Sequence, residues 1–296
     1  MSALKNATAQ AKLRVETARA RYGWFDVAIS TFKRFSEGDG GFYAAGLTYY
    51  AFFSVFPLVL FAVSALGFVA FLSQELKQDL LDAGRESFPL IGEILTINNL
   101  NKIEDARFSL AAVGLLLVLY SGTGGIVAFE HALNRIHGVS EEGTFFQKRM
   151  RSLRFLGAIG VIALASVAFG AVWRFIDSPV VSVFAFLAGF GTSVLLFASA
   201  FRFLPQANLT WSEVLPGAVV AGAIFEVLKI VGPTYLASGE EGRNATFGAF
   251  AAAAGLLISA FLLCQVALLA AQLNAVLAER RQSREFSLAN KDKEAP

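Results

Sequence analysis

The sequence has few of the residues that build disulfides and metal sites. It contains one cysteine, Cys264, so no intramolecular disulfide can form, and this cysteine lies within a hydrophobic run, which disfavours redox chemistry. The two histidines, His131 and His137, have no cysteines near them at the spacing of zinc or iron sites. No cofactor is therefore predicted. Charged residues are also scarce, at 16% against about 25% in ordinary globular proteins, which argues against a soluble fold.

Hydrophobic residues, in contrast, make up 55% of the chain and are grouped into long runs. A helix needs about 20 apolar residues to cross a bilayer core of about 30 Å. The runs therefore predict an all-α, polytopic membrane protein with six transmembrane helices. The predicted membrane domain covers residues 38–278, with spans at about 42–72, 108–129, 153–175, 179–203, 214–236 and 247–277.

The segments outside the spans are amphipathic or charged. Residues 1–37 read as a basic tail followed by an interfacial helix, because aromatic residues such as Trp24 and Phe32 recur at helical spacing before a glycine-rich turn. The basic start lacks a short apolar core with a cleavage site, so no removable signal peptide is expected. The first outer loop, 73–107, has leucines and isoleucines spaced for amphipathic helices. Residues 279–296 form a charged tail.

The distribution of basic residues predicts how the chain sits in its membrane. Lysines and arginines are abundant in the N-terminal segment, in the loop after the second span and in the C-terminal tail, and they are few in the other loops. Positive charges stay on the cytoplasmic side during insertion. Six spans put both termini on one side, so both termini are predicted to be cytoplasmic.

The fifth predicted span carries two charged residues in its apolar middle. Glu226 lies near the centre and Lys229 follows three residues later on the same helical face, where the two can pair. Ala218 and Gly222 continue this face as a row of small residues, which predicts that the pair points into the bundle. Two interpretations stay open: a salt bridge that only fixes helix packing, or a group beside a path for a substrate, an ion or a lipid headgroup.

Polar residues on the first and sixth spans are candidates for extending such a path. Tyr50, Ser54 and Pro57 share a face, and a polar stripe that ends at a broken helix lines the site of several transporters. The simpler alternative is that a hydroxyl satisfies the backbone carbonyl that Pro57 leaves free. Gln265 and Gln272 share a face on the sixth span, where hydrogen bonding between helices is the cheaper explanation.

The loop after the second span is strongly basic. Arg135, Lys148, Arg149 and Arg151 predict a cytoplasmic surface that docks a partner or anionic lipid. The alternative is that these residues only orient the chain in the membrane.

Several segments together resemble the YihY/virulence factor BrkB family of bacterial inner-membrane proteins. They are AAGLTYYAFFSVFP at 44–57, ALNRIHGV at 132–139, FLP at 203–205, LPGA at 215–218 and QLNA at 272–275. The resemblance covers about residues 42–281 and implies six membrane helices and a location in the bacterial cytoplasmic membrane. Where the family often has a glutamate, this chain has Gln272, which puts a charged role there in doubt.

Two functions are compatible with these features. The first is transport of a small solute or ion, or handling of lipid, along a polar path lined by the first, fifth and sixth helices. The alternative is a non-transporting scaffold that binds a partner or anionic lipid through the basic loop. Membrane lipids and an unidentified solute or ion are the expected partners, without nucleic acid, and the chain is compatible with an oligomer.

No enzymatic activity is predicted from the residues. Some members of the family once carried the label ribonuclease BN. Hydrolysis of RNA needs a metal cluster or an acid/base constellation in a soluble pocket. His131, His137 and Glu130, close to a membrane face, do not supply one.

Overall fold

The part of the chain that the structure describes is built from α-helices. The structure is a computed structural model that describes residues 22–72, 105–140, 143–173, 179–237 and 249–294. The helices in these ranges are α2 (Gly23–Glu37), α3 (Gly40–Leu72), α7 (Arg107–Ile136), α8 (Phe145–Trp173), α9 (Pro179–Phe203), α10 (Trp211–Ala237) and α12 (Ala249–Glu294). Two predicted segments lie outside the described residues. They are the basic tail up to residue 21 and the part of the first outer loop, 73–104, where amphipathic helices are predicted.

Five of these helices contain a segment long and apolar enough to cross a membrane. The segments are Gly40–Phe61, Arg107–Ile136, Phe186–Phe203, Trp211–Lys229 and Ala253–Ser287. They overlap the first, second, fourth, fifth and sixth predicted spans. The third predicted span coincides with α8, whose side chains are described only up to Val161. The protein is therefore a polytopic membrane protein, and six crossings stay a prediction.

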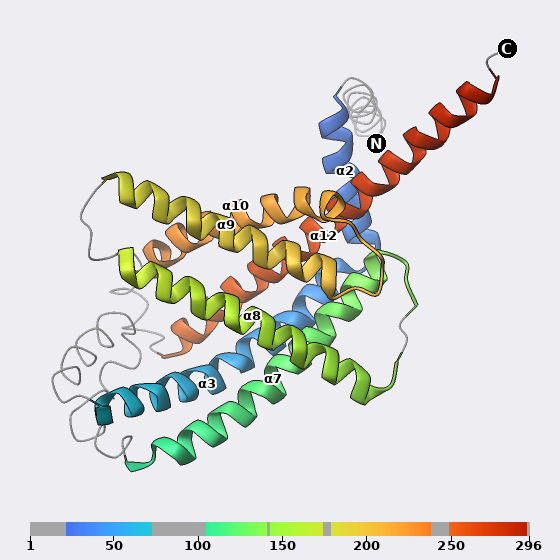
Figure 1. The fold of residues 1–296 in the computed structure, drawn as a ribbon. Helices are drawn as coiled ribbons and strands as arrows, with labels where there is room; N and C mark the ends of the chain where they lie inside the picture. The colour runs from blue at the N-terminus through green and yellow to red at the C-terminus, as the bar shows by residue number, and fades with distance from the viewer. Residues whose placement is uncertain (1–21, 73–104, 141–142, 174–178, 238–248, 295–296) are drawn as a thin grey trace, which may run out of the picture.

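The helices form two packed pairs joined by α12. One pair is α3 with α7 and the other is α9 with α10, while α12 packs against both α3 and α10 (Figure 1). Many side chains at these contacts are small, as expected inside a membrane, where close backbone approach holds helices together because lipid tails are as apolar as the side chains. The buried alanines include Ala198, Ala218, Ala221, Ala270 and Ala271.

Most of the buried side chains gather at one end of the bundle, which we call the charged end. It comprises α2, the start of α3, the C-terminal part of α7, the start of α8, the end of α9, the connection 204–210, the start of α10, and α12 from about residue 264 onward. Leu133, Phe201, Val214 and Leu268 are each at most 1% exposed there. The C-terminal part of α12 and α2 lie together at the upper right of Figure 1.

A tight turn joins α2 to α3, as the glycine-rich segment predicts. Asp39 has a φ of 57°, in the left-handed region that few residues other than glycine, asparagine and aspartate adopt readily. A Cβ on Gly40 would overlap the ring of Phe35, the buried aromatic residue near the end of α2. Gly40 therefore lets α3 start directly against α2.

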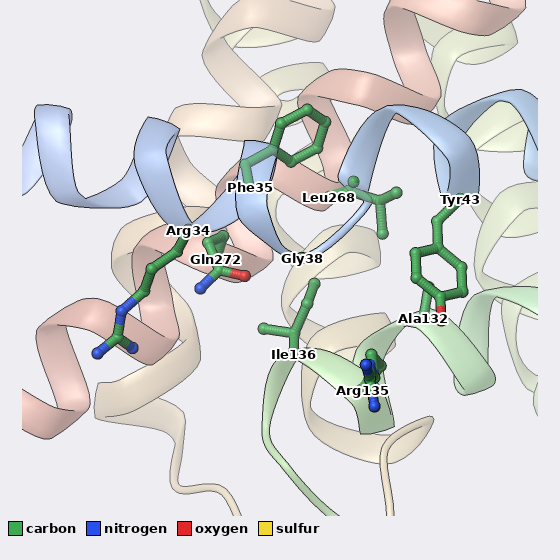
Figure 2. Close-up of a pocket in the computed structure, with 10 residues that line it drawn as sticks. Arg34, Phe35, Gly38, Tyr43, Ala132, Arg135, Ile136, Leu268 and Gln272 are labelled. Atoms are coloured by element: carbon green, nitrogen blue, oxygen red, sulfur yellow. The ribbon is translucent and has the colours of Figure 1, made fainter.

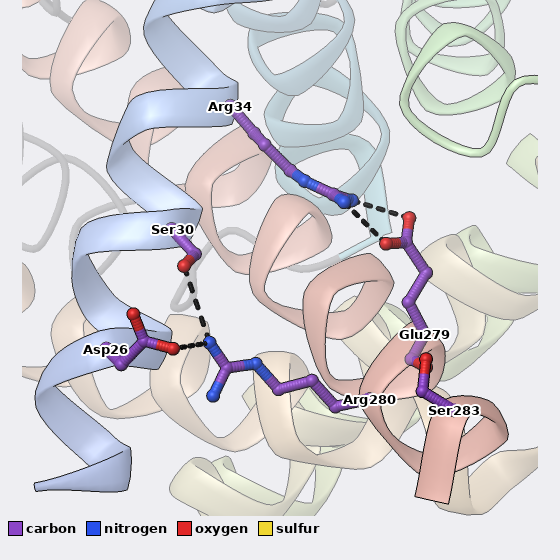
Figure 3. Close-up of polar contacts among 6 residues, drawn as sticks. All are labelled: Asp26, Ser30, Arg34, Glu279, Arg280 and Ser283. Atoms are coloured by element: carbon purple, nitrogen blue, oxygen red, sulfur yellow. Dashed lines mark hydrogen bonds and ion pairs between the residues drawn. The ribbon is translucent and has the colours of Figure 1, made fainter. Parts of the chain in front are cut away.

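The C-terminal segment predicted as a charged tail is helical, because α12 continues to Glu294. The segment has no glycine or proline before Pro296 and is rich in helix-forming alanine, leucine, glutamate and arginine. Ion pairs also tie it to α2: Arg34 with Glu279, and Arg280 with Asp26 (Figure 3). The hydrogen bond to Glu279 raises the pKa of the Arg34 guanidinium.

Candidate functional site

Small residues on α10 bring its middle close to α9. Gly222 is buried, and a Cβ there would lie 2.8 Å from Cγ2 of Val194 on α9. Ala218 and Ala221 are fully buried on the same helix. This close packing is the row of small residues predicted beside Glu226. Because of this close packing, the next turn of α10, which contains Glu226, lies against α9.

Glu226 points into the bundle, where it contacts α9 and the next turn of its own helix. The residue is 8% exposed and lies about 22 Å along α10 from Trp211, at 1.5 Å per residue. Ser193 of α9 donates a hydrogen bond of 2.8 Å to Glu226 Oε1, and Lys229 Nζ lies 2.6 Å from the same oxygen. Among the described residues, no donor contacts Oε2. The carboxylate thus keeps one oxygen able to accept further bonds.

Lys229 is less enclosed than the sequence predicts. Its side chain is 44% exposed, and its Nζ lies 5.2 Å from the centre of the Phe225 ring. The lysine and the glutamate belong to the same helix, three residues apart. The cation can therefore leave the carboxylate by rotation of its own side chain, without movement of a second helix.

The other residues predicted for a polar path lie elsewhere in the bundle. Tyr50 packs against α7, where a Cβ on Gly124 would lie 2.9 Å from the tyrosine ring. The hydroxyl of Ser54 donates to the Ala51 carbonyl at 2.8 Å, since a serine hydroxyl in a helix reaches back three or four residues. It therefore does not satisfy the carbonyl of Phe53, which is the one that Pro57 leaves free.

The two glutamines of α12 lie at different levels of that helix. Gln265 is half-buried in the middle of α12, and Gln272, at the charged end, lines a pocket with residues of α2, α3 and α7. α3 contacts α7 and α12, whereas α10 contacts α9 and α12. Tyr50 and Gln272 thus lie apart from Glu226, which contacts Lys229 and Ser193.

Of the basic residues predicted after the second span, Arg135 is exposed at the end of α7, whereas Arg149 and Arg151 are held within the chain. Arg149 donates to Thr123 Oγ1 at 2.8 Å and lies over the rings of Tyr120 and Phe145. Arg151 forms an ion pair of 2.8 Å with Glu130. These two guanidinium groups therefore bind α7 from the start of α8, and Lys148 is half-buried beside them on the same helix.

Glu130 is a second buried carboxylate and is not among the residues predicted from the sequence. It is 3% exposed near the end of α7. Besides Arg151, it accepts a bond of 3.2 Å from the Gln206 side chain, while the Gln206 backbone N–H donates to Asn134 Oδ1 at 2.7 Å. Glu130 and Asn134 are four residues apart on one helical face, which is the signal that could have marked them. Together they fasten α7 to α8 and to the connection before α10.

Asn274 fastens α12 to the start of α10. Its Oδ1 accepts a 2.7 Å bond from the Gly217 N–H, and its Nδ2 donates to the Val214 carbonyl at 3.0 Å. Pro216 has no N–H for the carbonyl of Ser212, and Arg281 donates to that carbonyl at 3.1 Å. The charged end is therefore linked through side chains of α7, α8, α10 and α12.

Within the described residues, no group of three histidine, cysteine, aspartate or glutamate side chains is placed to hold a metal ion. In the middle of the bundle, the candidate ligand site consists of Glu226, Ser193 and Lys229. A carboxylate, a hydroxyl and an ammonium group can accept, donate and exchange bonds with a cation or a polar solute.

Comparisons with known proteins agree with this architecture. The model of the family described as virulence factor BrkB matches residues 31–295. The inner membrane protein YhjD of Escherichia coli is 26% identical over 69% of this chain and 67% of its own length. The ribonuclease-like protein YfkH of Bacillus subtilis is 24% identical over 85% of this chain and 94% of its own length. No solved structure matches the chain.

Proposed function

We propose that this chain, which belongs to the virulence factor BrkB family of membrane proteins, transports a small solute or ion or handles lipid, with Glu226 contacting the cargo. Its location in the bacterial inner membrane is part of the proposal and is supported by the name of its Escherichia coli relative. The observation that carries the proposal is the half-satisfied carboxylate of Glu226 in the middle of the bundle.

The contacts of Glu226 suit a group that exchanges partners. Two donors share Oε1, which leaves Oε2 to accept a bond from an arriving cation or polar solute. The side chain of Lys229 is 44% exposed, so it can turn away while the cargo replaces its charge. Ionisable groups within membrane helices cost several kcal/mol and commonly mark ion and substrate pathways.

A flux assay on purified protein in liposomes tests this function. Proton movement is followed with an enclosed pH-sensitive dye, and lipid movement is followed with a fluorescent phosphatidylglycerol that external dithionite quenches. We expect the wild type to move at least one of these two probes faster than empty liposomes. Glu226→Gln should lower that rate at least tenfold, because the amide keeps the shape of the side chain and removes its charge.

The matched control is Glu37→Gln, which removes an exposed carboxylate of α2 that pairs with Lys33 of the same helix. Its flux should equal that of the wild type. Movement of neither probe by the wild type, or equal rates for wild type and Glu226→Gln, would contradict a transport role for Glu226.

RNA hydrolysis has no part in the proposed function, although the name of the Bacillus subtilis relative refers to it. We propose instead that the chain binds no nucleic acid and has no enzymatic activity. Incubation of the purified protein with labelled RNA and divalent metal ions checks this point. Cleavage above the level of a mock preparation would contradict it.

We also propose that the charged end lies in the cytoplasm. The basic residues Arg34, Arg135, Arg149, Arg151 and Arg280 all lie at this end, and basic residues are retained on the cytoplasmic side. A green fluorescent protein fused after Pro296 should therefore fluoresce in cells, whereas alkaline phosphatase at the same place should be inactive. The reverse pattern would invert the orientation.

The alternative function is a scaffold that docks through the basic loop. Fewer basic side chains of this loop are available to a partner than the sequence predicts. Arg149 and Arg151 bind Thr123 and Glu130 within the chain. Arg135, in contrast, is exposed. If the loop binds anionic lipid, we expect the lipid to contact the surface around Arg135.

A further inference from the structure

A pocket of about 220 Å³ opens at the charged end between α2, α3, α7 and α12. Figure 2 shows the side chains that line it. Its inner wall is apolar and includes Phe35, Ala132 and Leu268, which are all buried. Its polar groups come from four different helices: Arg34 of α2, Tyr43 of α3, Arg135 of α7 and Gln272 of α12. Pockets for drug-sized molecules measure about 300–1,000 Å³, so this one suits a smaller group.

The amide of Gln272 is the most unusual feature of the lining. The residue is only 7% exposed, yet its side chain has no hydrogen-bond partner among the described residues. Two residues further along the same helix, Asn274 uses both ends of its amide on α10. The Gln272 amide is not among the buried polar atoms that lack a partner, so it reaches the open pocket and is available there to bond with what the pocket contains.

The charge of the pocket favours an anion. Arg135 is exposed at the end of α7, and none of the described residues pairs with its guanidinium. Arg34, on the other side, is held by both oxygens of Glu279, which compensates its charge. The lining therefore has one uncompensated positive charge. A guanidinium group presents donors in a planar fork that matches a phosphate group.

The pocket lies beside a helix with the character of a membrane-interface element. On α2, Trp24 is 72% exposed and Phe32 is 66% exposed, whereas Thr31 and Phe35 are buried against the bundle. Exposed aromatic residues on such a helix sit at the level of the lipid headgroups. Lipid headgroups around α2 are therefore the nearest source of phosphate for the pocket, which Arg34 and Phe35 of α2 help to line.

We propose that this pocket binds a phosphate ester, supplied by the headgroup of an anionic phospholipid. Arg135 pairs with the phosphate, the Gln272 amide and the Tyr43 hydroxyl donate to its oxygens, and the apolar wall receives the glycerol backbone. The site lies at the charged end, apart from Glu226 in the middle of the bundle, and does not depend on transport.

Binding of a short-chain phosphatidylglycerol to the purified full-length protein in neutral detergent tests the site. We expect Arg135→Gln to raise the dissociation constant about tenfold, the usual effect of losing a charge-assisted bond. Gln272→Glu should weaken binding by at least as much, because it places a negative charge against the phosphate. The matched control is Arg154→Gln, which removes an exposed arginine of α8 outside the pocket and should change binding less than twofold.

The same assay separates a lipid from a soluble ligand and from the transport proposal. Short-chain phosphatidylcholine should bind more weakly, and glycerol 3-phosphate should not compete at equal concentration. Effective competition by glycerol 3-phosphate would overturn the lipid assignment in favour of a soluble phosphate ester. Equal binding by wild type and Arg135→Gln, or equal losses in Arg135→Gln and Arg154→Gln, would overturn the site. Glu226→Gln should bind phosphatidylglycerol like the wild type.

Discussion

The bundle contains two buried carboxylates that are paired in different ways. Glu130, at the charged end, is 3% exposed and takes its partners from other segments: Arg151 of α8 and Gln206 of the connection before α10. Glu226, in the middle, is 8% exposed and takes its cation, Lys229, from its own helix. Only Ser193 reaches it from elsewhere among the described residues.

This difference indicates different roles. An ion pair between helices fixes their relative position, and losing one partner leaves the other without compensation. An ion pair within one helix adds little to the packing of that helix on its neighbours. Glu130 therefore belongs to the framework of the charged end, whereas Glu226 is free to exchange its partner. Substitution of Glu130 should therefore lower the stability of the protein, whereas substitution of Glu226 should lower its flux.

The largest effect on stability is expected for Glu130→Gln. The change removes the ion pair between Glu130 and Arg151, and because Arg151 is 38% exposed, water offsets part of the loss. We expect a decrease of about 2–3 kcal/mol in the free energy of unfolding. Unfolding in mixed micelles measures it, with Glu37→Gln as the control. A loss below about 0.5 kcal/mol would show that the cluster does not hold the charged end.

A second test compares two glycines of α10. A Cβ on Gly217 would overlap the Ala270 carbonyl oxygen and lie 2.6 Å from Asn274 Oδ1, so Gly217→Ala should destabilise the protein by about 1–3 kcal/mol. Gly222→Ala meets Val194 near Glu226 and should reduce flux more than stability. Gly157→Ala, with no atom within 4 Å, is the control. Identical behaviour of the first two variants would remove the distinction between framework and site.

The smallest effect is expected for Ser193→Ala. It removes one hydrogen bond to Glu226, worth about 1 kcal/mol, and leaves the ion pair with Lys229 in place. We expect flux to change severalfold while the unfolding temperature moves little. Thr192→Ala is the matched control, because that hydroxyl bonds to the Ala188 carbonyl of its own helix. Equal flux in both variants would exclude Ser193 from the site.

The long apolar helices could be predicted because their length and composition are local properties. The inward direction of Glu226 followed in the same way from Ala218 and Gly222 on its face. The pair formed by Glu130 and Gln206, which are 76 residues apart, could not be predicted. It depends on how α7 and the connection after α9 are rotated toward each other, and hydropathy does not specify rotation.

The same limit explains the basic loop and the C-terminal segment. The sequence alone suggests that Arg149 and Arg151 are exposed, because it does not show which helix lies beside them. In the structure they lie at the start of α8 and contact Thr123 and Glu130 of α7. A change from apolar to charged residues after Leu277 marks where the membrane-facing part of α12 ends. It does not mark the end of the helix, which continues to Glu294 and forms ion pairs with α2 at Glu279 and Arg280.

Flux measured per folded molecule in Glu226→Gln and Glu130→Gln liposomes tests the central claim most directly. We expect Glu226→Gln to unfold like the wild type and to lose at least nine-tenths of its proton or lipid flux. Glu130→Gln should unfold more easily but retain the flux of the wild type in the fraction that stays folded. Full flux in Glu226→Gln, or loss of flux only in step with stability, would contradict a transport role for this carboxylate.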